Sequence, residues 1–171
     1  MKHLLVLVFC LFTCVSFCQT QVTLSLPEVA LLAISPANSN INLGFSLPSQ
    51  AGESILNNQN DNTKWLNLTS AVRNGQNRRI IAQLTSGVFN SGYSIVLETT
   101  KLGGSGVLGN VNTSIVLSSG VQNIITGIGG AFTGVGASGY NLKYSLRIKD
   151  YALLRAESNT SYTITFTLTD N

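Results

Sequence analysis

The sequence predicts an all-β protein, an antiparallel β-sandwich of about nine strands with immunoglobulin-like or jelly-roll topology. Three observations favour this fold. Apolar and polar residues alternate along most of the chain, turn-forming residues recur about every 8–20 positions, and no long stretch has helical periodicity. A closed β-barrel is the second architecture consistent with this pattern. No repeat of fixed period is present, which disfavours solenoids and propellers.

The first 18 residues have the pattern of a secretory signal peptide. Residues 1–3 (MKH) are cationic, residues 4–15 (LLVLVFCLFTCV) are almost entirely apolar, and residues 16–18 (SFC) place small residues before Gln19. The apolar run is too short to span a bilayer as a helix. We therefore expect cleavage before Gln19, one exported domain over residues 19–171, and no transmembrane segment after cleavage.

This leader holds every cysteine, the only histidine and the only methionine of the chain. From Gln19 onward the chain has no thiol nucleophile, no imidazole base, and no Cys/His set for zinc or iron. Lipidation of Cys18 is the alternative to cleavage before Gln19. Phe17 disfavours it, because lipidated cysteines usually follow a small residue.

Alternation places the expected strands in order along the chain. They are expected at residues 22–26, 29–34, 41–47, 64–69, 79–85, 93–97, 113–117, 142–148 and 162–168. Pro27, Pro36 and Pro48 each end one of the first three, where a missing N–H does least damage. In the last strand, Tyr162, Ile164, Phe166 and Leu168 share one face and four threonines the other.

The connections are polar or rich in glycine. Residues 49–63 are expected to form a long exposed loop, and Asn74-Gly75 predicts a hairpin turn. Thirteen of the sixteen glycines lie between Gly87 and Gly139, and they concentrate in residues 102–110 and 127–139. Both glycine-rich segments should be mobile or tightly turned. Helical leanings are confined to residues 151–157.

Charge argues against a nucleic-acid-binding surface. Charged residues are only 10% of the chain, against roughly a quarter in an average domain. Without Lys2 the chain keeps nine of its ten Lys/Arg and all seven Asp/Glu, a net charge of +2. Arg78-Arg79 is the only basic doublet, and beside the Asn74-Gly75 turn it is interpreted as the solvated start of a strand.

No catalytic, cofactor-binding or metal-binding residues are expected. The carboxylates are scattered singly, without the close pair that glycoside hydrolysis needs. Residues 134–139 satisfy G-x-G-x-x-G, but they precede a strand pattern rather than the helix that a dinucleotide site requires. Residues 57–61 (NNQND) contain oxygen ligands but one carboxylate, too little charge for tight calcium binding.

Two apolar features have competing interpretations. Trp65 starts a strand beside Leu66 and Leu68, so we expect it to pack against the core rather than to stack on a sugar ring. The alternating Val22, Leu24 and Leu26 are expected to form the first strand of their own sandwich. The alternative is that this segment adds to a sheet edge of a neighbouring molecule.

The end of the chain resembles a known group of proteins. Residues 142–148 (LKYSLRI) followed by residues 162–170 (YTITFTLTD) are similar to the last strands of bacterial secreted sandwich domains, notably the spore coat protein U and Csu-type pilin group. Residues 65–68 (WLNL) with the terminal TFTLTDN resemble, more faintly, the WxL cell-surface domains. The resemblance covers about a third of the chain and implies a bacterial surface or fimbrial role, with no catalytic residue to carry over.

We therefore expect an exported, non-catalytic structural or adhesive protein of a bacterial cell surface, which self-associates through edge strands in the manner of a fimbrial or pilin-like subunit. The alternative is a secreted module that binds a carbohydrate or another small ligand. In that case residues 102–110 and 127–139 would line the site, together with Tyr140 and Phe132.

Overall fold

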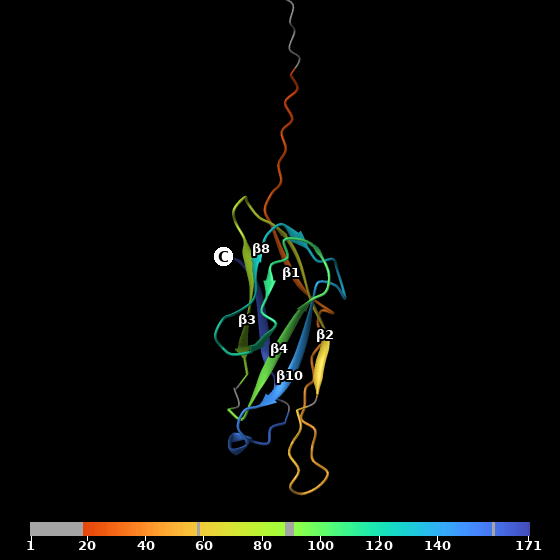
Figure 1. Ribbon diagram of the computed structural model, residues 1–171, viewed down its shortest axis with the longest axis vertical. Coiled ribbons are helices and arrows are strands. Elements are labelled where there is room, and N and C mark those ends of the chain that lie inside the picture. Colours follow the sequence, from red (N-terminus) through yellow and green to blue (C-terminus); the bar gives the residue numbers. More distant parts are fainter. Residues whose placement is uncertain (1–18, 58, 88–90, 159) are drawn as a thin grey trace, which may run out of the picture.

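The computed structural model describes residues 19–57, 59–87, 91–158 and 160–171. The expected signal peptide, residues 1–18, lies outside the described residues. Within the described part, eleven strands form two antiparallel sheets that pack against each other, which confirms the predicted β-sandwich (Figure 1). The same residues contain no helix with the length and apolar character that a membrane span requires.

The first sheet is built around β2, which pairs with β1 on one side and with β10 and β9 on the other. β10 pairs in turn with β4, β4 with β7, and β9 with β5. The strands of this sheet are β1 (Val29–Ser35), β2 (Asn60–Ala71), β4 (Tyr93–Lys101), β5 (Ser105–Gly106), β7 (Ser114–Val116), β9 (Ala131–Phe132) and β10 (Tyr140–Ile148).

The second sheet has the order β11-β3-β8-β6. Its strands are β3 (Arg78–Ser86), β6 (Asn110–Val111), β8 (Gln122–Ile128) and β11 (Thr163–Asp170). The 3-10 turn Tyr151–Leu153 lies between β10 and β11, where the sequence has its helical leanings. As expected, Ile164, Phe166 and Leu168 of β11 pack toward the core, and the threonines between them are exposed.

The core lies between the two sheets and is formed by side chains of alternate residues. The fully buried residues include Leu66, Ile80, Leu97, Ile124, Ile125, Ile128, Tyr140 and Leu142. Three of these belong to β8, a strand that the sequence analysis does not predict. The consecutive burial of Ile124 and Ile125 breaks the period of two, and the pairing of β8 with β3 shifts register at this point.

The structure corrects three expectations about the first half of the chain. Residues 41–47 form no continuous strand, apart from a bridge between Ser46 and Leu56. Residues 60–63 belong to β2 rather than to a loop. The Asn74-Gly75 turn joins no hairpin, because β2 and β3 lie in different sheets. The turn carries the chain across the sandwich, so that β2 and β3 cover opposite sides of the same core.

The two glycine-rich segments pair with each other and are tightly built. β5 pairs with β9, and Val107 and Gly130 extend that contact through a backbone hydrogen bond of 3.0 Å. A Cβ at Gly106, where φ is +87°, would collide with the Gly130 carbonyl oxygen. Glycine is therefore required here because two backbones approach more closely than a side chain allows.

Two tyrosines, Tyr140 and Tyr144, are buried in the sandwich, and a third, Tyr93, is half-buried. Tyr140 is fully buried, and its hydroxyl donates to the Leu108 carbonyl oxygen. Burial raises the pKa of Tyr140 to about 12. Burial also raises the pKa of Tyr144, assisted by Asp61, and that of Tyr93, assisted by hydrogen bonds to Tyr162 and Glu157. These hydroxyls therefore stay protonated in the folded chain at pH values where exposed tyrosines ionise.

Alkaline pH should destabilise the fold through these tyrosines. Below about pH 9 both the folded and the unfolded chain keep them protonated. Above about pH 10 the unfolded chain releases protons that the folded chain retains, so the free energy of unfolding falls with rising pH. We expect the midpoint of urea unfolding to be lower at about pH 11 than at about pH 8.

The Tyr140→Phe variant provides the control for this effect. At neutral pH its free energy of unfolding should be lower by about 1–3 kcal/mol, because the Leu108 carbonyl loses its hydrogen-bond donor. Between about pH 8 and pH 11, its free energy of unfolding should fall by less than that of the unchanged protein. An equal alkaline loss in both proteins would contradict the role of Tyr140.

The glycine requirement predicts unequal effects of two alanine substitutions. Gly106→Ala should destabilise the protein by more than the roughly 1–3 kcal/mol typical of backbone strain, because strain and collision add. Gly136→Ala is the matched control, since Gly136 also has a positive φ (+69°) but has open space where a Cβ would lie. Thermal unfolding of both variants tests this, and equal losses would show that collision plays no part.

Candidate functional site

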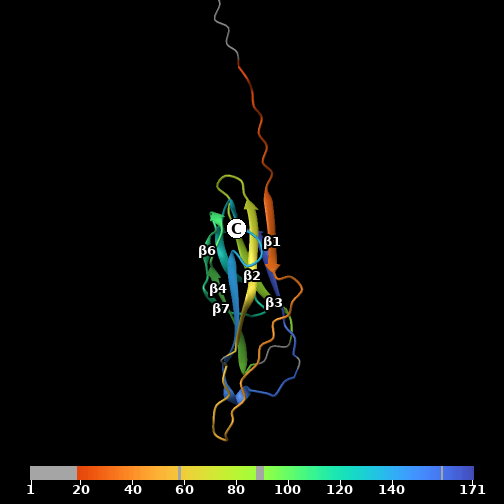
Figure 2. The same ribbon diagram turned by 90° about the vertical axis from the view of Figure 1, so that its right-hand side faces the viewer.

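The N-terminal segment, residues 19–28, leaves the sandwich as an extended chain that pairs with no strand in the described structure (Figures 1 and 2). Its alternating apolar side chains face solvent, with exposed fractions of 74% for Val22, 91% for Leu24 and 84% for Leu26. The expectation that they form the first strand of their own sandwich is therefore wrong. Pro27 is one reason, because a tight return onto β1 needs a positive φ that proline cannot adopt.

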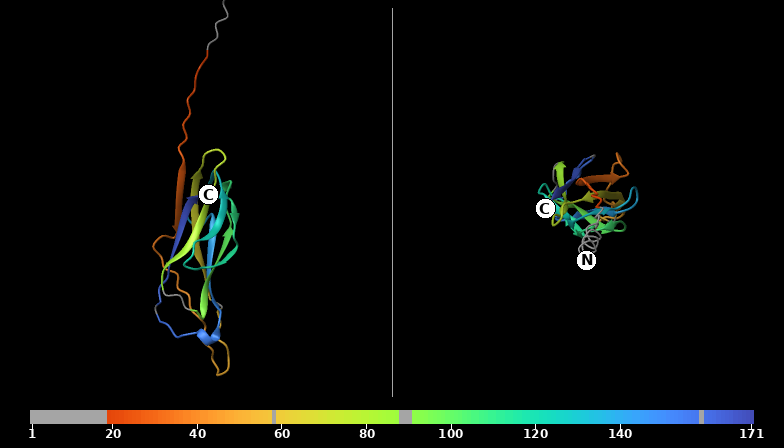
Figure 3. Two further views of the ribbon diagram at one scale, coloured as in Figure 1. Left: turned by 90° about the vertical axis from the view of Figure 1, so that its left-hand side faces the viewer. Right: turned by 90° about the horizontal axis from the view of Figure 1, so that it is seen from above.

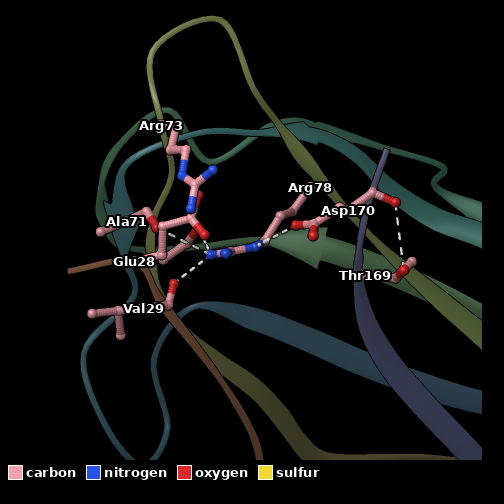
Figure 4. Close-up of polar contacts among 8 residues, drawn as sticks. Glu28, Val29, Ala71, Arg73, Arg78, Thr169 and Asp170 are labelled. Carbon is pink, nitrogen blue, oxygen red and sulfur yellow. Dashed lines mark hydrogen bonds and ion pairs between the residues drawn. The ribbon is translucent and has the colours of Figure 1, made fainter.

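The side chain of Arg78 holds the point at which this segment joins the sandwich (Figure 4). Its Nη1 donates to the carbonyl oxygens of Val29 and Ala71, the latter at 3.2 Å, and its Nε donates to Asp170 Oδ1 at 2.9 Å. The Arg78 side chain is only 7% exposed. Arg78 on β3 therefore contacts the start of β1 and the end of β2 in the first sheet, and the end of β11 in its own sheet.

A second buried cation holds the other end of β1. The Lys64 ammonium donates to the Pro36 carbonyl oxygen at 3.2 Å and to the Ser39 hydroxyl. β1 is thus fixed at both ends, by Arg78 and by Lys64. The exposed ion pair of Glu28 and Arg73, at 3.3 Å, adds little, because solvent screens such pairs.

β1 and β11 are edge strands of different sheets and lie next to each other (Figures 2 and 3). We call this side of the sandwich the β1–β11 edge. The core-facing residues here are only half-buried: Leu32, Ile34, Ile164, Phe166 and Leu168. On the neighbouring strand β3, Ile80 and Ala82 are fully buried. The apolar core is therefore less well covered at the β1–β11 edge.

The opposite side of the sandwich is closed by the chain itself. Residues 112–113 connect β6 of the second sheet directly to β7 of the first. Ile115 and Leu117, which face the core at this side, are buried. The two sides of the sandwich therefore differ in how well they cover the core.

The glycine-rich segments do not bring together the predicted ligand-site residues. Phe132 is 56% exposed on the outer face of the first sheet, whereas Tyr140 is inaccessible inside the core. Residues 134–139, which carry the G-x-G-x-x-G pattern, connect β9 to β10 and open no helix. Because the Tyr140 hydroxyl is bound to the Leu108 carbonyl, it cannot contact a ligand in this structure.

The seven carboxylates each make a different contact, and no two share a partner among the described bonds. The contacts are Glu28 with Arg73, Glu53 with Ser49 and Gln50, Asp61 with Thr63, Glu98 with Lys143, Asp150 with the Ala152 N–H, Glu157 with Tyr93 and Thr160, and Asp170 with Arg78. In the described part of the chain, no three His, Cys, Asp or Glu residues gather as a metal site would require.

The weak calcium candidate, residues 57–61, is used otherwise. Asn57 donates to the Leu146 carbonyl oxygen, and Asp61 Oδ1 accepts from the N–H and hydroxyl of Thr63. Asn58 lies outside the described residues.

Trp65 faces away from the core, contrary to expectation. It alternates with the buried Leu66 and Leu68 on β2, so its side chain lies on the outer face of the first sheet, where it is half-buried. Phe132 pairs with Thr69, which shares this outer face, so both aromatic residues lie on the same side of the sheet.

The two buried cations were missed, although the alternation contains their signal. Arg78 has the same parity as the core-facing Ile80 and Ala82, and Lys64 has the same parity as Leu66. The interpretation of Arg78 as a solvated residue is therefore wrong. A cation at a core-facing position of a strand indicates that it donates to nearby oxygen acceptors such as backbone carbonyls.

Loss of the Arg78 guanidinium should weaken the sandwich. Arg78→Met keeps most of the volume but removes the donors to Val29 and Ala71, and we expect a loss of about 2–4 kcal/mol in the free energy of unfolding. The control is Arg73→Met, which breaks an exposed ion pair and should cost less than about 1 kcal/mol. Urea unfolding measures both, and similar small losses would contradict the structural role of Arg78.

Comparison with known proteins identifies no relative. No family model, no curated protein and no solved structure matches the chain.

Proposed function

We propose that this protein is an exported, non-catalytic structural or adhesive subunit of a bacterial cell surface, and that its copies associate through their N-terminal strands. The observation that carries the proposal is the exposure of Val22, Leu24 and Leu26 on an extended segment with strand alternation. Residues 22–26 contain no charged side chain, so no charge has to be desolvated when this stretch enters an apolar interface.

Energetics support association through this segment. Burial of each such aliphatic side chain contributes about 1.5–3 kcal/mol. Association costs an estimated 4–15 kcal/mol in lost freedom of motion, so three side chains offset the lower part of that range. Backbone hydrogen bonds of an added strand supply a further contribution, as they do in other cases of strand addition to a sheet edge.

The remaining surface is consistent with a structural role. The chain from Gln19 has no cysteine or histidine, and each carboxylate contacts a different partner. The similarity of residues 142–148 and 162–170 to secreted sandwich domains favours a fimbrial or pilin-like form of assembly.

A second candidate is a carbohydrate-binding module. It is favoured by the position of Trp65 and Phe132 on one outer face of the first sheet, because aromatic rings on a sheet face can stack on sugars.

Protein purified from the exported fraction should form multimers that grow with concentration, as measured by size-exclusion chromatography with light scattering. Replacing Val22, Leu24 and Leu26 with serine should leave a monomer, because the apolar face is lost. The matched control replaces Thr23 and Ser25, on the other face of the same strand, with asparagine and should retain the multimers.

Two results would contradict the proposal. One is a serine variant that still forms multimers. The other is an unchanged protein that stays monomeric at the highest attainable concentration, and a rise in its melting temperature with an oligosaccharide would then favour the second candidate.

A further inference from the structure

We propose that the acceptor for the N-terminal strand is the β1–β11 edge of a second copy of this chain, where residues 22–26 pair antiparallel with β11. The inference rests on the proposed function and adds to it the docking position and the direction of the strand. Residues 22–26 would then become a fifth strand of the second sheet, beyond β11.

The choice of edge follows from length, charge and burial. In the described structure, β11 has eight residues and pairs only with β3, whereas the edge strands β5, β6 and β7 have only two or three residues. The seven-residue edge strand β1 starts beside the end of β11 and therefore runs opposite to it, so the same approach would pair the segment parallel to β1, the less stable arrangement. Residues 163–169 contain no charge and no proline, the features by which proteins usually protect an open edge. Ile164, Phe166 and Leu168 are only half-buried, so an added apolar strand would complete their cover.

The strand comes from a second copy because the geometry keeps it away from its own edge. Arg78 fixes Val29 beside Asp170, and the segment leaves the sandwich from there as an extended chain pointing outward (Figures 1 and 3). Pro27 prevents a tight two-residue return, and it also holds Leu26 in an extended conformation.

The direction of the strand follows from the same contact. The segment leaves its own copy beside Asp170. When a second copy is stacked beyond the first in the same orientation, the segment reaches that second copy at the Thr163 end of its β11. Its N-terminus enters first, so residues 22 to 26 run from Leu168 toward Ile164, antiparallel to β11. This direction also gives the better hydrogen-bond geometry.

Matching the two strands at their centres places Leu24 opposite Phe166. The apolar Val22, Leu24 and Leu26 then face the core together with Leu168, Phe166 and Ile164. On the outer face, Thr23 lies opposite Thr167 and Ser25 lies opposite Thr165. Directly opposed residues on one face of a sheet are close enough for an introduced disulfide, whereas diagonal ones are too far apart.

Disulfide trapping in the exported protein tests this arrangement. Mass spectrometry first confirms that the chain begins after Cys18, so that introduced cysteines are the only ones. Two double variants, Thr23→Cys with Thr167→Cys and Ser25→Cys with Thr165→Cys, should give ladders of covalent multimers on non-reducing gels. Peptide mapping should identify links between residues 23 and 167, or 25 and 165, of different copies.

The matched controls use the same four positions in exchanged pairs. Thr23→Cys with Thr165→Cys, and Ser25→Cys with Thr167→Cys, would link if the strands were parallel, and we expect no ladder from either. Ser25→Cys with Ser114→Cys tests the short edge strand β7 and should also give none.

The outcomes separate this inference from the proposed function. If light scattering shows multimers but the links form in the exchanged pairs, at Ser114, or in no variant, the docking position or direction is overturned and the proposed function stands. If the unchanged protein forms no multimers, both are overturned. Ladders in the first two variants alone support both.

Discussion

The buried guanidinium of Arg78 is the contact on which the arrangement of both sheets depends. From Gln19 onward the chain has no cysteine and few charges, so the sheets are held by apolar packing and by a small number of polar contacts. Arg78 makes three such contacts across the sandwich, to Val29, Ser70 and Ala71, and a fourth to Asp170 in its own sheet. Buried cations are normally costly. Here the cost is offset because the guanidinium donates to the backbone carbonyls of Val29 and Ala71 and to the Asp170 carboxylate.

That contact also separates the fixed part of the chain from the free part. The backbone of β1, which begins at Val29, is held in the first sheet by pairing with β2 and by contacts with Arg78 and Lys64. Before Val29 the chain has the alternation of a strand, and within the described residues it pairs with no other strand. An unpaired apolar strand and a long uncharged edge are both liabilities in a monomer. Their presence in one chain, each with an alternating apolar face, is the physical basis on which we propose assembly by exchange of a strand between copies.

Glycine in this protein serves close backbone packing as well as turning. β5 and β9 approach so closely at Gly106 that no side chain fits, and Leu108, a few residues further on, accepts the hydrogen bond of Tyr140. The glycine-rich region is therefore part of the sandwich rather than a flexible rim around a binding site. Aromatic groups that could contact a sugar lie instead on the outer face of the first sheet, at Trp65 and Phe132.

Alternation along the chain predicts the fold class, the faces of regular strands such as β10 and β11, and the apolar face of residues 22–26. A period of two reports which side chains share a face, and this is a local property of the backbone. It does not report which strands pair, so the separation of β2 and β3 into two sheets was decided by the tertiary structure. Burial of Arg78, the outward position of Trp65 and the irregular strand β8 were decided there too. Each depends on neighbours far away in the sequence, whose positions no local pattern encodes.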